Sequence, residues 1–300
     1  MRIGTFAGDL GGPNSTVQAA VDAARAAADL GFTSFWMPQI FGLDALTALG
    51  VIGAQVPGIE LGTAVVPVYP RHPSALAQQA LTVQSASAGR LTLGIGLSHQ
   101  VVIEHMMGYS FDKPASYMEE YLASLAPLLR GEQTDVDGDR VTTHMKLDIA
   151  APTPPGLIVA ALGERMLHLA AEHADGTATW MTGPRTLAEH TVPTLRAAAG
   201  ADTKRVVAAL PVAVTDDVAG ARARAAEAFK IYGVLPSYRA MLDREGCATP
   251  GRMALIGDAD TVAAKIASFA GLGVTTFAAK IFGTPGERAA TRALVAALAR

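Results

Sequence analysis

Residues that can move a proton stand directly after an apolar run with the character of a β-strand. The run Gly94-Ile95-Gly96-Leu97-Ser98-His99 ends in a hydroxyl and an imidazole, and imidazole changes its charge near neutral pH. Its glycines allow a ligand to approach the backbone closely. His99 is therefore the first candidate for a catalytic proton donor. Its alternative role is a hydrogen bond to a bound ligand, which Gly96, Leu97 and Ser98 would also contact.

A second run, Ala160-Ala161-Leu162-Gly163-Glu164-Arg165, joins another strand-like segment to a helical one. Free backbone N–H groups at a helix start are a common means of binding phosphate. Ala161, Leu162, Gly163 and Glu164 are therefore candidate binding residues, and the alternative is an ordinary turn between strand and helix. Met181 and Thr182 follow a further strand-like run, so they could face the same ligand.

Polar residues also follow three other strand-like runs. Gln39 is a second candidate catalytic residue, because its amide could hydrogen-bond a ligand, and its alternative role is a loop cap. Arg71 and His72 precede Pro73, and we expect them to cap or orient a helix. Lys280 could meet an anionic group or remain a solvated strand-end cation.

The elements that must position these residues alternate between strand and helix, and this alternation predicts parallel strands joined by helical crossovers. Active sites of parallel α/β barrels lie at the carboxyl ends of the strands, where the candidates fall. The sequence predicts an α/β fold, a (β/α)8 TIM barrel with inserted segments. The strands are expected at Arg2–Phe6, Ser34–Pro38, Glu60–Val66, Leu91–Ile95, Leu157–Ala161, Thr177–Trp180, Val206–Val214 and Thr276–Ile281.

Two segments are additional to the eight β/α units of a minimal barrel. Between 131 and 151, the turn-like Asp137-Gly138-Asp139 predicts an inserted hairpin. Between 233 and 257, Leu235-Pro236-Ser237-Tyr238 has the form of a helix start, and the segment could form a lid or pack against a partner chain. We expect one domain over 1–300 with these two insertions.

Composition excludes several classes of protein. The 300 residues are 50% hydrophobic and carry a formal net charge of −3, so a sizeable core fits and no basic footprint for nucleic acid is present. The single cysteine cannot form an internal disulfide, and glycine and proline interrupt each apolar run before membrane-spanning length. Together with the absence of a leader pattern, this favours a cytoplasmic protein that does not enter membranes. The histidines lack metal-ligand spacing, so no metal is expected.

The segment Glu60–Pro73, followed by Gly89-Arg90-Leu91-Thr92-Leu93-Gly94-Ile95-Gly96-Leu97-Ser98-His99, resembles the third and fourth β/α units of the luciferase-like monooxygenase superfamily. These enzymes are barrels that hold a flavin or the deazaflavin coenzyme F420. With Gly108-Tyr109-Ser110-Phe111-Asp112, the pattern is most similar to actinobacterial members that use reduced F420. The resemblance extends over nearly the whole chain in order.

The resemblance implies specific roles. Thr63-Ala64-Val65 matches the bulge of the family, where a non-prolyl cis peptide, here between Ala64 and Val65, lies behind the coenzyme ring. The start of the helix at Gly163 resembles the anchor for the coenzyme phosphate. Sugar-phosphate dehydrogenases of the family carry an acidic residue and a histidine where this chain has Gln39 and Ile40, which argues against that branch.

The function expected on this basis is an F420-dependent reductase that transfers hydride to a C=C or C=N bond of a small organic substrate. An FMN-dependent monooxygenase and a non-catalytic deazaflavin-binding protein are the alternatives. The resemblance also implies a homodimer. An apolar pocket lined by Phe6, Phe41, Tyr69 and Trp180 is expected to accept ring systems, without identifying the substrate.

Overall fold

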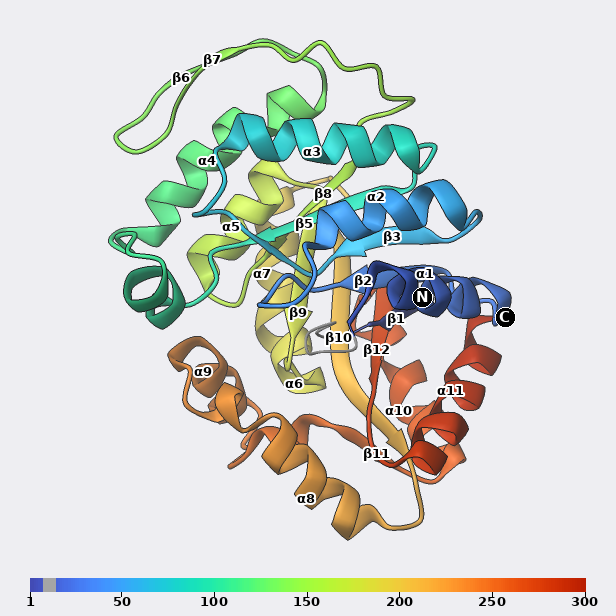
Figure 1. Cartoon of the computed structure of the whole chain (residues 1–300). Coiled ribbons are helices and arrows are strands. Elements are labelled where there is room, and N and C mark those ends of the chain that lie inside the picture. The colour runs from blue at the N-terminus through green and yellow to red at the C-terminus, as the bar shows by residue number, and fades with distance from the viewer. Residues whose placement is uncertain (8–14) are drawn as a thin grey trace.

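Eight parallel strands close into a barrel in the computed structural model, which describes residues 1–7 and 15–300 (Figure 1). Each strand pairs in parallel with the next, and β12 returns to pair with β1. The barrel strands are β1 Arg2–Phe6, β2 Ser34–Met37, β3 Glu60–Thr63, β5 Leu91–Gly96, β8 Gly156–Ala160, β9 Gly176–Trp180, β10 Arg205–Val214 and β12 Thr276–Ile281. The predicted TIM barrel is confirmed.

Strand positions agree with the sequence prediction to within one residue at most ends, because each strand is a short apolar run bounded by turn residues. The exception is the third run, which divides. Strand β3 ends at Thr63, and a two-residue strand β4, Val66–Pro67, pairs separately with β5. The interruption is the bulge at Ala64 and Val65.

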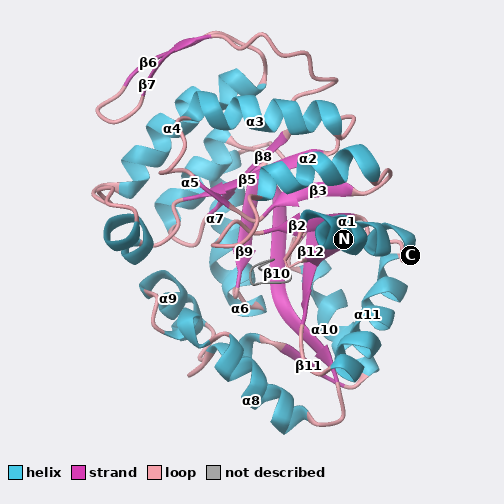
Figure 2. Cartoon of the chain, viewed as in Figure 1, coloured by secondary structure: helices cyan, strands magenta, loops and turns pink. Residues whose placement is uncertain are grey.

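Helices surround the barrel on its outside (Figure 2). Several begin with a side chain that accepts from the backbone of the first turn, which is the expected N-cap chemistry. The helices that follow the barrel strands are α1 Val17–Asp29, α2 Ala45–Gln55, α3 Pro73–Ala86, α4 Pro114–Leu129, α5 Glu164–His173, α6 Pro184–Thr186, α7 Val192–Ala199, α8 Val218–Ala228, α10 Ala259–Gly271 and α11 Pro285–Ala299. None of the helices in the described ranges combines the length and apolar character that crossing a membrane requires.

Both predicted insertions contain the expected structure. Strands β6 Thr134–Asp137 and β7 Thr142–Met145 form an antiparallel hairpin outside α4. The Glu120 carboxylate on α4 accepts hydrogen bonds from three consecutive backbone N–H groups of the hairpin turn, at residues 139–141. These hydrogen bonds attach the hairpin to α4. The second insertion contains α9, Pro236–Arg244, which begins at the predicted proline.

Short elements complete the connections between the barrel strands and the surrounding helices. They are the π-helical turns η1 Val101–Met106 and η2 Leu187–Thr191, the 3-10 turns η3 Lys230–Gly233 and η4 Pro250–Met253, and strand β11 Leu255–Gly257, which pairs with the end of β10. Of these, η1 and η3 lie at the carboxyl ends of the barrel strands, where the candidate residues fall.

A cluster of ions closes the amino-terminal end of the barrel. Glu60, at the start of β3, is 2.8 Å from the Arg205 guanidinium and 2.5 Å from that of Arg2, and it accepts a 2.6 Å hydrogen bond from Thr92. Burial alone would raise the pKa of Glu60, but the Arg205 charge, the hydrogen bonds from Thr92 and Arg205, and the Arg2 charge outweigh it. The pKa of Glu60 is therefore lower than its usual value.

We expect Glu60→Gln to lower the free energy of unfolding by about 1.5–3 kcal/mol at pH 7, the range for hydrogen bonds to a charged group. Because the folded-state pKa is lowered, this stabilisation is complete above the unfolded pKa and is lost as pH falls through the folded pKa. Urea unfolding at pH 7 and at successively lower pH measures both effects. Glu132→Gln, which breaks a half-exposed ion pair with Arg130, should lower the free energy of unfolding much less, because solvent screens this pair. Equal losses in the two variants would contradict this role of Glu60.

Candidate active site

A cavity of about 860 Å³ occupies the carboxyl-terminal half of the barrel. It is hollow because the strands present small residues to the interior at this level. Strand register aligns Ala209 with Trp180 on one side and with Ala278 on the other. Ala64, Gly96 and Ala160 are further small residues of its wall. Fully buried Trp36, whose indole N–H donates to the Ser34 hydroxyl at 2.8 Å, also borders the cavity and packs against the small side chains below it.

The bulge after β3 forms one wall of the cavity, and the peptide bond between Ala64 and Val65 is cis, as expected from the family resemblance. Its position depends on the glycines of β5. A Cβ at Gly94 would lie 2.0 Å from the Thr63 carbonyl oxygen, and one at Gly96 would lie 2.8 Å from the Val65 side chain. These glycines therefore admit the bulge of the neighbouring strand. Gly94 makes no space for a ligand, which corrects the interpretation from sequence.

His99 lies at the cavity mouth, in the loop between β5 and η1. Burial lowers the pKa of His99, so the neutral imidazole is its main form at pH 7. Its ring centroid lies 5.6 Å from that of Tyr238, which α9 brings to the same wall. Burial raises the pKa of Tyr238, so the phenol keeps its proton at neutral pH. The structure thus places two uncharged hydrogen-bonding groups side by side.

The start of α5 opens onto the same cavity. Leu162, Gly163 and Met166 line it, and the N-cap residue Gly163 makes no side-chain hydrogen bond to the first turn. A Cβ at Gly163 would meet no atom within 4 Å. The first backbone N–H groups of the helix therefore have no side-chain cap, and the space in front of Gly163 is open. This arrangement suits a phosphate group.

Helix α9 and the residue before it form another part of the cavity wall, and the carboxyl end of the helix is attached to α6. Leu235, Ser237 and Tyr238 line the cavity, while Glu245, the residue after the helix, accepts a 2.5 Å hydrogen bond from the Thr186 backbone N–H. Glu245 thus joins α9 to the turn that follows β9. In Figure 1, α9 lies on the same side of the molecule as the segment near residue 105, and residues of both line the cavity.

The structure brings most of the predicted residues together. Eight of them line the cavity, namely Ala64, Val65, Gly96, Leu97, Ser98, His99, Leu162 and Gly163. Phe6 and Trp180 also line it, stacked with ring centroids 5.3 Å apart. They lie together because strand ends of a closed barrel share one rim.

Gln39 does not line the cavity. Its side-chain oxygen accepts a 3.1 Å hydrogen bond from the backbone N–H of Ala45, the first residue of α2, so the capping alternative is confirmed. Arg71 pairs with Asp44, and His72 caps α3 and contacts the carbonyl of Thr142, so both orient structure as expected.

Four predicted binding residues also lie outside the cavity lining. Ala161 and Met181 are buried in the outer core, and Thr182 is buried with its hydroxyl 3.4 Å from the Trp180 carbonyl. Glu164 is exposed on the first turn of α5. Ala161 and Met181 each follow a cavity-lining residue at the end of a strand, and the residue next to an inward-facing position points away from it.

Two aromatic residues that the sequence predicts for the pocket, Phe41 and Tyr69, do not line the cavity. Lys280 does not line it either. Phe41 is 67% exposed, and Tyr69 stacks on Tyr117 within the core at a centroid distance of 4.4 Å. Sequence reasoning did not assign Trp36, His105 or Tyr238 to the site. The proline at the start of α9 was the available signal for Tyr238, since it marked a helix in an insertion near the barrel mouth.

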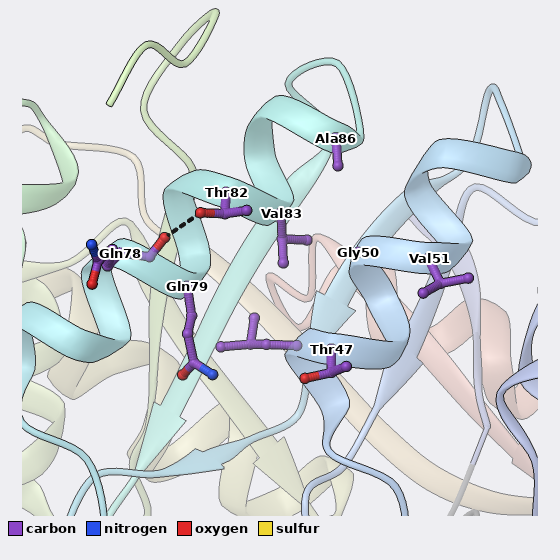
Figure 3. Close-up of a pocket in the computed structure, with 9 residues that line it drawn as sticks. Thr47, Gly50, Val51, Gln78, Gln79, Thr82, Val83 and Ala86 are labelled. Atoms are coloured by element: carbon purple, nitrogen blue, oxygen red, sulfur yellow. Dashed lines mark hydrogen bonds between the residues drawn. The ribbon is translucent and has the colours of Figure 1, made fainter. Parts of the chain in front are cut away.

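A second hollow of about 400 Å³ lies on the outer surface between α2 and α3 (Figure 3). Thr47, Gly50 and Val51 border it from α2, and Gln79 and Thr82 border it from α3. The described residues that line it include no titratable side chain, so they offer no acid–base chemistry.

The expected homodimer stays a prediction. Among residues 1–7 and 15–300, no group of three His, Cys, Asp or Glu side chains could hold a metal ion.

Comparison with known proteins agrees with this geometry. The sequence profile of the luciferase-like monooxygenase family matches residues 1–276. The chain belongs to this family. It is 29% identical over 253 residues to the 5,10-methylenetetrahydromethanopterin reductase of Methanolobus tindarius, covering 82% of this chain and 76% of that protein.

Two solved structures of similar fold have TM-scores of 0.79. The monooxygenase RslO1 from Streptomyces bottropensis is 22% identical, with 99% of this chain and 98% of that chain covered. The coenzyme F420-dependent tetrahydromethanopterin reductase from Methanopyrus kandleri is 21% identical, with 98% and 97% covered. At these identities the likeness concerns the fold.

We expect Glu245→Ala to accelerate backbone hydrogen exchange in α9 and in the 181–186 turn by roughly 10- to 100-fold. The reason is the loss of a hydrogen bond to a carboxylate, about 1.5–3 kcal/mol. Mass spectrometry of exchanged peptides measures this. Glu245→Gln keeps an acceptor oxygen and should change exchange less, and Glu227→Ala, which removes an exposed partner of Lys230, should leave both segments unchanged. Unaltered exchange in Glu245→Ala would show that α9 is held elsewhere.

Proposed function

We propose that this member of the luciferase-like family is an F420-dependent oxidoreductase, acting as a reductase that transfers hydride to a C=C or C=N bond of a small organic molecule. The observation that carries the proposal is one cavity with three complementary parts. The bulge at Ala64 and Val65 offers a flat wall, the uncapped start of α5 offers N–H groups, and His99 stands at the mouth.

The cavity fits a tricyclic coenzyme with a phosphate-bearing tail. Ala64 and Val65 would support the ring from behind, and the N–H groups after Gly163 would hold the phosphate. Gly96, Leu97 and Ser98 would contact the ring from the end of β5. When bound in reduced form, F420 supplies a hydride, which is two electrons transferred together with one hydrogen.

The names of similar proteins support F420. The reductase of Methanopyrus kandleri is named as F420-dependent, and the relative from Methanolobus tindarius is a reductase. The same fold in the monooxygenase RslO1 supports oxygenation as the second candidate function, with FMN as the alternative coenzyme. Coenzyme binding without turnover would instead identify the protein as a deazaflavin-binding protein.

The chain itself must stabilise the atom that gains charge when hydride adds. The neutral imidazole of His99 can donate a hydrogen bond to that atom, as can the protonated phenol of Tyr238. The aromatic pair Phe6 and Trp180 would exclude water beside the reacting bond. His99 remains the first candidate for delivering the proton that completes the reduction, and Tyr238 is the competing group.

We expect wild-type protein to bind F420 more tightly than FMN, and Gly163→Asp to weaken coenzyme binding by about 3- to 30-fold, because a carboxylate at the helix start repels phosphate. Fluorescence titrations with both coenzymes measure this. Gly163→Asn is the matched control, since it caps the helix equally well without charge. A preference for FMN would overturn the assignment of F420, and normal binding by a folded Gly163→Asp would place the phosphate elsewhere.

We expect His99→Ala to lower turnover by roughly 10²–10⁴-fold with less effect on coenzyme affinity, the range for a positioned acid–base group. Single-turnover oxidation of reduced F420 and fluorescence titration separate the two effects. His168→Ala, an exposed substitution on α5, is the control. A loss confined to coenzyme affinity, about 0.5–1.5 kcal/mol, would make His99 a coenzyme ligand.

The pH profile of turnover is expected to follow from the lowered pKa of His99. As a neutral donor, the imidazole is intact above that pKa, so turnover should decrease on acidification and should not decrease as pH rises from 7 to 8. If the imidazolium is the acid, turnover decreases steadily as pH rises above the pKa of His99. Stopped-flow measurement of wild type and His99→Ala distinguishes these profiles.

A further inference from the structure

The cavity has an unusual electrostatic character. In the part of the chain that the structure describes, no Asp, Glu, Lys or Arg is among the residues that line it. The charged groups near the mouth serve other contacts. Glu104 accepts from the Phe111 backbone N–H at 3.1 Å, Arg165 is hydrogen-bonded to Ser116, and Glu245 holds α9.

Away from the start of α5, an anion moved into the described part of this site loses its hydration and meets no Lys or Arg side chain in exchange. That transfer costs several kcal/mol, even where the protein relaxes around the charge. An uncharged molecule avoids this cost and gains from the burial of its apolar surface. The lining therefore discriminates between neutral and ionised molecules of the same shape.

The apolar surface continues from the barrel interior to the outside. Val101 on η1, Ile231 on η3 and Val234 just after η3 line the cavity, and they are 46%, 53% and 73% exposed. We call these three residues the apolar rim. Exposed apolar side chains that continue a cavity lining are typical of a surface that meets an apolar ligand.

The interior offers a flat aromatic surface, and the polar side chains that line the cavity carry hydroxyl, amide or imidazole groups. Trp180 stacks on Phe6 with an interplanar angle of 17° and meets Tyr232 edge-on. His99, Gln100 and Tyr238 contribute uncharged hydrogen-bonding groups near the mouth. This combination suits a ring that carries one hydrogen-bond acceptor.

We propose that the substrate is an uncharged, mainly apolar ring compound with a single conjugated carbonyl or imine acceptor, which reaches the cavity across the apolar rim. The proposal rests on the reductase function proposed above and specifies its substrate class. For an α,β-unsaturated ketone, the β-carbon gains the hydride of reduced F420 and the α-carbon gains a proton. The C=C bond becomes C–C, and F420 is oxidised by two electrons.

The first test uses a matched pair, cyclohex-2-enone and 3-oxocyclohex-1-ene-1-carboxylate. The affinity of each compound for the protein without coenzyme is measured by displacement of the neutral dye Nile red. The fluorescence of the dye reports the displacement. We expect the ketone to bind at least about 30-fold more tightly than the carboxylate, because only the carboxylate must be desolvated as an ion. Cyclohexenones with lengthening alkyl chains should gain up to about fourfold in affinity per methylene as the chain reaches the apolar rim.

A second test places a cation at the apolar rim. Val234→Lys should narrow the ratio between ketone and carboxylate affinities by at least about fivefold, because the carboxylate gains a partner. Val234→Gln is the matched control for polarity and length. Val218→Lys, an exposed change on α8, controls for net charge and should leave the ratio unchanged.

The outcomes separate this proposal from the reductase function. If the ketone and the carboxylate bind equally well, or if neither displaces Nile red, the proposed substrate class is overturned. Both measurements are made without coenzyme, so they do not depend on the reductase function. A protein that binds neither F420 nor FMN but retains the preference for the ketone instead overturns the reductase function. Oxidation of reduced F420 by the ketone and not by the carboxylate supports both.

Discussion

The close approach of the bulge after β3 to the glycines of β5 is the constraint on which the site depends. The Thr63 carbonyl and the Val65 side chain occupy the positions that side chains at Gly94 and Gly96 would take. Because backbone fills that side of the barrel, no large side chain enters the upper interior from β5. The alanines of β9, β10 and β12 keep the opposite side open. The cavity therefore results from close packing between the bulge after β3 and β5 on one side, and from small residues of β9, β10 and β12 on the other.

Charge is divided between the two ends of the barrel. At the amino-terminal end, Glu60 joins strands β1, β3, β5 and β10 through Arg2, Thr92 and Arg205. At the other end, the described lining holds no charged side chain. Hydrogen bonds from neutral groups such as His99 and Tyr238 act more strongly there than they would in water, since little solvent screens them. Stability and chemistry thus use separate sets of polar residues.

The part of the cavity wall formed by α9 lies outside the β/α units of the barrel. Helix α9 lies outside the β/α repeat, and Glu245 attaches it to the turn after β9. It contributes Ser237 and Tyr238 to the cavity, and η3 before it contributes Ile231 to the apolar rim. Loops at the carboxyl ends of barrel strands can vary without disturbing the strands, because they contribute little to closure of the sheet. Specificity in this chain is therefore expected to depend on α9 more than on the barrel.

The sequence by itself determined the elements that local chemistry specifies. Apolar runs between turn residues gave the eight strands, Pro236 marked the start of α9, and the strand-to-helix junction at Gly163 indicated an open helix start. The tertiary structure decided which neighbouring residues face inward and what they meet. Gln39 caps α2, Met181 and Thr182 turn away from the cavity, and Tyr238 lies beside His99. These outcomes depend on contacts between segments distant in the chain, and the period of a pattern specifies a face without specifying its neighbour.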